Sequence, residues 1–373
     1  MTRLGSVATG RDNNLNLIRM LAAFAVLVSH AWPLDLGSGT PEPLKAFVGQ
    51  SLGTLAVYVF FVISGFLITA SFQRTHSRSR FVLARVLRLL PGLAVSLLIV
   101  AFCLGPLVTT WPVADYLRAP ETWMFLVRNL TMALPQYTLP GVFDTNPYPA
   151  VEGSIWTLIH EVLCYVMVFA AGVAGLLGSG RRMAVFLGLY AAGWALTLAF
   201  SEVFPERLLV LRNLSLPFVI GMAGWIWRDR VVLSVWVVPV LGLAWFGLRD
   251  TALAFPALTL FVCYATAWFA FIPSGGLHVY NRLGDYSYGI YIYAFPVQGL
   301  IVWAFGSLGP VLHIALATPP VVILSVMSWH VVERPALQWL KRRRPGPVPP
   351  RQQAPNPGPT PAIPRGRPNP ADE

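Results

Sequence analysis

Charged residues are scarce in this sequence: Asp, Glu, Lys and Arg make up 12% of its 373 residues, against 55% hydrophobic residues. A soluble globular domain carries about twice that fraction of charge. The scarcity excludes an ordinary soluble protein and predicts that most of the chain lies in lipid. Cysteine is also rare. Cys103, Cys164 and Cys263 lie in separate apolar runs without paired spacing, so we expect packing residues rather than metal ligands.

Apolar runs of about twenty residues recur along the chain, the length that a helix needs to cross about 30 Å of hydrocarbon. We therefore expect an all-α polytopic membrane protein, a bundle of about ten transmembrane helices. Residues 1–340 would form the membrane domain, and residues 341–373 a basic, Pro-rich, disordered cytoplasmic tail. An amphipathic helix over residues 115–133 would change the count if it entered the bilayer. The expected spans are residues 11–33, 55–72, 81–108, 154–177, 184–200, 208–227, 231–248, 252–272, 284–305 and 311–332.

The formal net charge of +11 does not indicate nucleic acid, because the basic residues fall in short loops and in the tail. Arginines concentrate in loops 74–80, 181–182 and 228–230 and in the tail, whereas the alternate loops carry the acidic residues. The positive-inside rule then places both termini in the cytoplasm. We expect membrane lipids, rather than nucleic acid, as partners of these charges.

The first apolar run contains two residues that are energetically costly to place in a membrane, Arg19 and His30. Eleven helical positions bring them to within about 20° of the same face, about 16 Å apart along the axis. Ionisable residues inside a membrane usually mark a pathway or a site. The alternative is that Arg19 extends to the headgroups at one boundary and His30 lies alone at the other.

Three more ionisable residues lie inside expected spans. Glu161 follows the outer end of its span by about 8 Å, so it can share a depth with His30 and form an acid–base pair. Alternatively, Glu161 pairs with His160 or Tyr165. Arg85 and Arg88 share a helical face near the cytoplasmic end, where they can bind phosphate oxygens or simply anchor the helix.

These residues belong to motifs, and together the motifs resemble the acyltransferase-3 family of integral membrane O-acyltransferases over about residues 12–340. Each motif alone is weak, but six in this order are specific. They are Arg19-x10-His30, VFFVISGFL at 59–67, Arg85-x-x-Arg88 before Pro91, SIWTL at 154–158 with Glu161 and Tyr165, LGDYSYGIY at 283–291, and ERP at 333–335.

The resemblance implies transfer of an acyl group, usually acetyl, from a cytoplasmic coenzyme A thioester to a hydroxyl. The acceptor would be a cell-surface or lipid-linked glycan, and the enzyme would lie in the bacterial inner membrane. Acetyl-CoA or another acyl-CoA would be a co-substrate, with no bound cofactor and no metal. His30 would be the catalytic base or a transient acyl carrier, and Glu161 would orient it or receive its proton.

By the same resemblance, Arg19, Arg85 and Arg88 would hold the acyl donor, and Trp156, Tyr165 and Tyr291 would support the site. The sequence departs from the family at Ala294, where many members carry a histidine, so the acceptor or the mechanism can differ here. Two other hypotheses for the function remain: acylation of a small lipophilic acceptor such as a macrolide, and transport of a glycolipid by a transporter or flippase. The second predicts repeated halves, and no such repeat is evident.

Overall fold

The computed structural model describes residues 2–342 apart from residues 9, 11 and 76, and it is helical through most of that length. Arg11, the predicted start of the first span, and residues 343–373 of the predicted tail lie outside the described residues. The strands β1 (Thr2–Arg3) and β2 (Val232–Leu233) form one short antiparallel pair. This pair ties the amino-terminal segment to the loop after the sixth long helix.

Nine helices in the described part of the chain are long and apolar enough to cross a membrane, which confirms the all-α membrane class. The seventh predicted span, 231–248, is the exception, since it contains only the twelve-residue helix α12 (Val237–Leu248). The nine are α2 (Leu15–Leu36), α4 (Leu52–Arg74), α5–η1–α6 (Arg78–Ile99, Val100–Leu104, Gly105–Val108), η2–α9 (Ser154–Thr157, Leu158–Val173), α10 (Gly180–Ala199), α11 (Glu206–Ile226), α13 (Ala254–Phe271), α14 (Ser287–Phe305) and α15–η4–α16 (Pro310–Ser328, Trp329–Glu333, Arg334–Arg342).

The first long helix, α2, does not stop at Pro33 as its sequence suggested. Pro33 lies in the last turn, and the helix ends at Leu36, before Gly37 with a φ of 98°. A proline inside a helix removes one hydrogen bond and its ring crowds the carbonyl four residues earlier, and α2 ends within one turn of Pro33. At the other end, the Asn14 side chain donates hydrogen bonds to the carbonyls of Phe269 and Pro273, which attaches the start of α2 to the end of α13.

The predicted amphipathic helix over residues 115–133 is two helices, α7 (Val113–Arg118) and α8 (Pro120–Thr131). Ala119 separates them with an extended ψ of 126°. The residue before a proline avoids the helical region because the proline ring collides with it, so Pro120 ends one helix and begins the next. The remaining short helices are α1 (Leu4–Val7), α3 (Pro43–Val48) and η3 (Gly275–Arg282).

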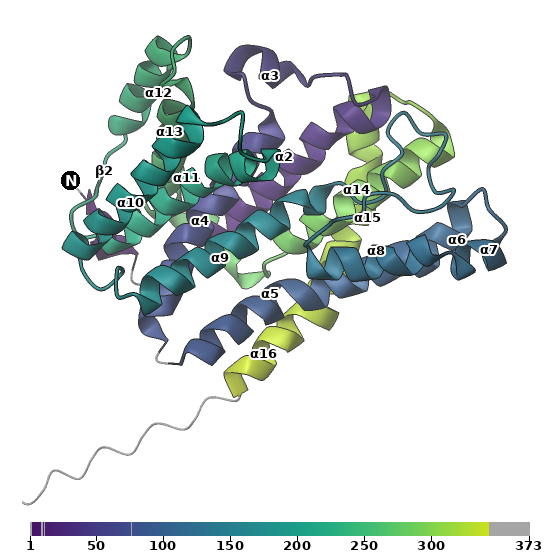
Figure 1. Cartoon of the computed structure of the whole chain (residues 1–373), viewed down its shortest axis with the longest axis horizontal. Coiled ribbons are helices and arrows are strands. Elements are labelled where there is room, and N and C mark those ends of the chain that lie inside the picture. The colour runs from purple at the N-terminus through teal and green to yellow at the C-terminus, as the bar shows by residue number, and fades with distance from the viewer. Residues whose placement is uncertain (1, 9, 11, 76, 343–373) are drawn as a thin grey trace, which may run out of the picture.

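Helices α2, α4 and α14 lie at the centre of the bundle (Figure 1). The contacts between α2 and α14 advance in the same direction along both helices. Ala23 and Leu27 cluster with Ile290 and Ala294, and the Gln298 amide donates to the Leu27 carbonyl at 3.0 Å. These two helices are therefore parallel.

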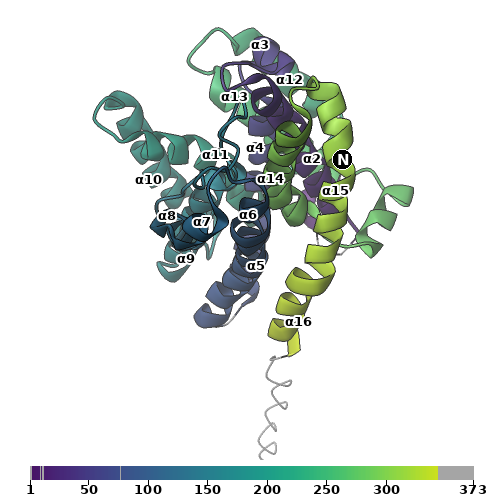
Figure 2. The same ribbon diagram turned by 90° about the vertical axis from the view of Figure 1, so that its right-hand side faces the viewer.

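The α5 and α16 helices project from one end of the molecule, as both views show (Figure 1, Figure 2). The Arg80 guanidinium in the first turn of α5 donates to the Leu340 carbonyl of α16 at 3.0 Å. The last membrane helix is thus longer than the predicted span 311–332, since it continues through a π-helical turn to Arg342. The predicted domain boundary at residue 340 falls inside α16.

Candidate functional site

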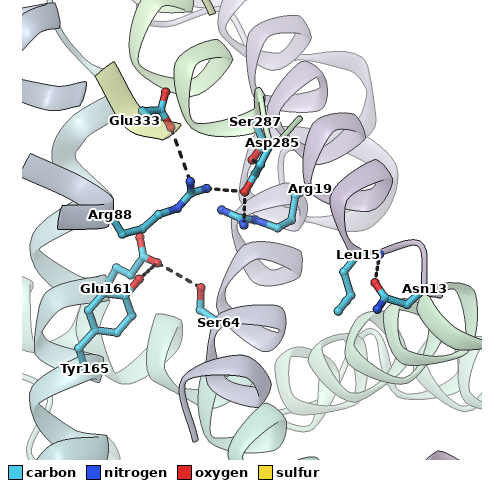
Figure 3. A network of polar contacts seen from close by, with 10 residues as sticks. All are labelled: Asn13, Leu15, Arg19, Ser64, Arg88, Glu161, Tyr165, Asp285, Ser287 and Glu333. Carbon is cyan, nitrogen blue, oxygen red and sulfur yellow. Dashed lines mark hydrogen bonds and ion pairs between the residues drawn. The ribbon is translucent and has the colours of Figure 1, made fainter. Parts of the chain in front are cut away.

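Two of the predicted arginines meet at one carboxylate, that of Asp285, which lies just before α14. Arg19 of α2 and Arg88 of α5 approach Asp285 Oδ2 at 2.6 and 2.5 Å (Figure 3). The Ser287 hydroxyl donates to the other oxygen at 2.5 Å. Burial opposes ionisation of Asp285, but the two guanidinium charges outweigh it and lower its pKa to about 2. Asp285 therefore carries a negative charge that both arginines share.

Arg88 also contacts Glu333 in the π-helical turn η4, at 3.6 Å. Glu333 is buried, and Ser328 donates to it at 3.1 Å. Arg88 thereby connects α5 with α14 and with the last long helix. Asp285 and Glu333 were not among the predicted site residues, although both stand in the motifs 283–291 and 333–335. A search of those motifs for acidic side chains would have found them.

Glu161 does not pair with His30, and that prediction is wrong for the described structure. Its partners are Ser64 of α4, which donates at 3.1 Å, and Tyr165, which donates from one turn further along α9 (Figure 3). The spacing of four residues places Tyr165 beside Glu161 on the same face. The alternative with Tyr165 is thus correct, whereas His160 bonds instead to the Trp156 carbonyl at 3.1 Å.

Arg85 differs from the other two arginines because no carboxylate in the described part of the chain lies within ion-pair distance of it. Its guanidinium carbon lies 5.7 Å from the ring centre of Phe81 and 5.9 Å from that of Tyr165. Its buried Nε has no hydrogen-bond partner among the described residues. Arg85 is therefore the arginine of the three whose charge is available to a ligand.

The three arginines, Glu161 and Tyr165 line one cavity of about 340 Å³, which we call the central cavity. Its walls come from α2, α4, α5, α9, α14 and α16, and the α16 residues are Leu337, Leu340 and Lys341. The structure thus brings together six of the eight predicted site residues. They are Arg19, Arg85, Arg88, Glu161, Tyr165 and Tyr291.

Tyr291 fixes the wall of the central cavity between α14 and η2. Its hydroxyl donates to the Ser154 carbonyl at 2.5 Å and accepts from Thr157, also at 2.5 Å. Thr157 lines the cavity as well. Trp156, between these two residues, does not line it: its side chain is 38% exposed, and its ring meets His160 edge to face.

His30 lies further along α2 and is not part of the central cavity. Its ring contacts Phe295 of α14 edge to face, with 5.3 Å between ring centres. Its Nδ1 is buried and has no hydrogen-bond partner among the described residues. Ala294, which stands where many acyltransferase-3 proteins have a histidine, is fully buried against Ala23 and Leu27 of α2.

No group of three or more His, Cys, Asp or Glu side chains in the described part of the chain is arranged to hold a metal ion. The site is built from arginines, carboxylates and tyrosines on helices that are far apart in sequence. These features define a class: a polytopic helical membrane protein whose helices enclose a cavity lined by a few charged side chains among apolar ones.

Comparison with known proteins places the chain within this class. The family model of the acyltransferase-3 acyltransferase domain matches residues 12–330, and the chain belongs to that family; it is a membrane acyltransferase. It is 30% identical over 335 residues to an O-acetyl transferase of Shigella phage Sf6, covering 87% of this chain and 96% of that protein. It is 28% identical over 367 residues to nodulation protein 10 of Rhizobium leguminosarum bv. viciae, covering 89% and 95%. No solved structure matches the chain.

Proposed function

We propose that this acyltransferase moves an acyl group, in the first place acetyl, from cytoplasmic acetyl-CoA to a hydroxyl of a cell-surface or lipid-linked glycan. The membrane would be the inner membrane of a bacterium. The name of the phage relative, O-acetyl transferase, supports the acetyl group and an oxygen acceptor. One observation carries the proposal: α2 presents Arg19 to the central cavity and, eleven residues later, the imidazole of His30. The Nδ1 of that imidazole has no hydrogen-bond partner in the part of the chain that the structure describes.

In this proposal the acyl thioester enters the central cavity, where Arg85 contacts the donor. Arg19 and Arg88, held by Asp285, provide positive charge along the cavity through which the acyl-thioester arm extends toward His30. His30 takes the proton of the acceptor hydroxyl, either directly or after carrying the acyl group itself. In direct transfer, the bond from carbonyl carbon to sulfur breaks as a bond from that carbon to the acceptor oxygen forms. If His30 carries the acyl group, a carbon–nitrogen bond to its imidazole forms as the carbon–sulfur bond breaks, and it breaks in turn as the bond to the acceptor oxygen forms. In both cases the proton of the acceptor hydroxyl ends on the departing thiol.

Glu161 has a different role from the one its sequence position suggested. Glu161 lines the central cavity together with Ser64 and Tyr165, where the donor would bind, whereas His30 lies outside that cavity. A carboxylate at that place orients Tyr165, whose ring lies beside Arg85. It therefore acts on the donor and on the released thiol, and not on the imidazole.

We also propose ten membrane crossings with both termini in the cytoplasm. The parallel packing of α2 and α14 supports this count. Parallel helices enter the bilayer from the same side, so the number of crossings between them must be odd. Seven helices separate α2 from α14 when α12 is counted as a crossing, and six when it is not.

The test is a transfer assay with purified protein in nanodiscs, radiolabelled acetyl-CoA and an extract of envelope glycolipids from a bacterial host. We expect label in the glycolipid fraction and release of free coenzyme A. Thiol release without label in any glycan would contradict the acceptor. Failure of the folded protein to bind or turn over any acyl-CoA would contradict the donor.

A further inference from the structure

The central cavity has a cationic end that the acyltransferase-3 motifs do not include. Leu337, Leu340 and Lys341 of α16 line it, and Lys341 is also exposed. Because these three residues recur at intervals of three and four, they share one face of the helix. Glu333, which contacts Arg88, lies eight residues before Lys341, or about 12 Å along the helix axis, and the face of these three residues continues that of Glu333. The cavity thus extends along α16 to an opening at Lys341, which we call the mouth.

The charge at the mouth has one sign. Residues 74–88 of α4 and α5 and residues 334–342 of α16 contain arginines and lysines but no aspartate or glutamate. Further inside, Asp285 and Glu333 are already occupied by Arg19 and Arg88. Among the described residues, Arg85 and Lys341 are the cavity-lining cations without an ion pair. The potential at the mouth therefore favours an anion over a neutral group.

The mouth is also held in place. The Arg80 guanidinium donates to the Leu340 carbonyl, so α16 is fixed to α5 one residue before Lys341. The ammonium group of Lys341 is thereby presented at the cavity by a tethered helix. A tethered cation loses less conformational freedom when it binds a ligand than one on a free terminus does.

We propose that Lys341 binds a phosphate group of the acyl donor at the mouth, while the uncharged acyl-thioester arm extends inward toward Arg85 and Glu161. This assignment rests on the proposed function, since it takes the donor to be a coenzyme A thioester. The nucleotide part of such a donor carries its phosphates at one end and its acyl group at the other. A cavity with a cationic mouth and a largely apolar wall matches that division.

The test compares Lys341→Gln with a matched control, Arg342→Gln. Arg342 is adjacent and of the same charge, but it lies about 100° further round α16 and does not line the cavity. Thiol release is measured with acetyl-CoA and with acetyl-pantetheine, an acyl thioester without phosphate. In Lys341→Gln we expect the KM for acetyl-CoA to rise about tenfold at unchanged kcat, the size expected for a lost hydrogen bond to a charged group. The KM for acetyl-pantetheine should stay the same, as should both values in Arg342→Gln.

A phosphate can also belong to a lipid headgroup, so the assay is repeated in nanodiscs of neutral and of anionic lipid. An effect of Lys341→Gln that needs anionic lipid, or that is equal for both donors, overturns the assignment, as does an unchanged KM for acetyl-CoA. Wild-type protein that binds coenzyme A but transfers no acyl group refutes the proposed function instead. The phosphate contact is then measured as the change in coenzyme A affinity in the same two variants.

Discussion

Arg19 of α2 and Asp285 before α14 form a 2.6 Å ion pair across 266 positions of the sequence. Asp285 is also the partner of Arg88, so one carboxylate holds two guanidinium groups from two helices. In a protein interior such a network is stable only when its charges are compensated. The pair therefore positions two arginines of the proposed donor site and also joins α2, α5 and the start of α14.

Replacing Asp285 by Asn should destabilise the protein, because Arg19 would be left as a partly buried cation without a carboxylate. We expect a loss of about 3 kcal/mol, seen as a lower unfolding temperature in detergent. Asp250→Asn is the matched control, since Asp250 is 88% exposed in its pair with Arg249. An unfolding temperature equal to that of the control would refute the structural role of Asp285.

Arg85 and Arg88 should respond differently to substitution, although they stand three residues apart. Arg85→Gln should raise the KM for the acyl donor about tenfold with little change in stability, because Arg85 makes no ion pair among the described residues. Arg88→Gln should lower stability as well, because it leaves the buried Glu333 without the cation that it pairs with. Donor kinetics and thermal unfolding of both variants measure this difference. Equal behaviour of the two variants in both assays would contradict it.

His30→Ala should lower acyl transfer by about a thousandfold while the protein stays folded, since a general base contributes about that factor. His330→Ala serves as the control, because His330 is exposed and lies away from the cavity walls. Transfer is measured with radiolabelled acetyl-CoA, and folding by size-exclusion chromatography and thermal unfolding. A His30→Ala protein that transfers at the normal rate would remove His30 from the mechanism.

Glu152 should make the stability of the protein depend on pH. Its side chain is 1% exposed, and burial raises its pKa from 4.5 to about 8, despite a hydrogen bond from Ser154. The folded state therefore binds this proton more tightly than the unfolded state does. The stabilisation is complete below pH 4.5 and declines by about 1.4 kcal/mol per pH unit as the pH rises toward 8.

In Glu152→Gln this dependence should disappear. The unfolding temperature of the variant, relative to that of wild type, should be higher at pH 8 than at pH 5. Glu202→Gln, which changes an exposed carboxylate, should follow wild type at both values. A Glu152→Gln protein whose difference from wild type is the same at both values would show that Glu152 ionises normally.

Gly65→Ala should separate α4 from α11. A Cβ at Gly65 would lie 2.0 Å from the Phe218 carbonyl oxygen, and a backbone atom cannot move aside as a flexible side chain can. We expect a loss of about 2 kcal/mol, typical of overpacking in a core. Gly188→Ala on α10, where a Cβ meets nothing within 4 Å, provides the comparison. Equal unfolding temperatures for the two variants would contradict the close contact.

The sequence alone determined the class of the protein, because hydrophobic runs long enough to span lipid are a local property. It also determined which residues are costly to bury, and hence four of the charged residues that line the cavity: Arg19, Arg85, Arg88 and Glu161. Helix ends were less predictable where a proline was involved. Pro33 was tolerated within a last turn, whereas Pro120 broke a predicted helix in two.

Only the tertiary structure decided which charges meet. The predicted pair of His30 with Glu161 rested on depth, but two residues at one depth pair only if their helices pack with those faces together. Glu161 instead meets Ser64 and Tyr165, and Arg19 meets Asp285. The sequence likewise suggested that Lys341 belongs to a basic tail. In the structure it lines the central cavity, because α16 packs against α5. The partner of a charge depends on helix packing, which no local pattern of residues specifies.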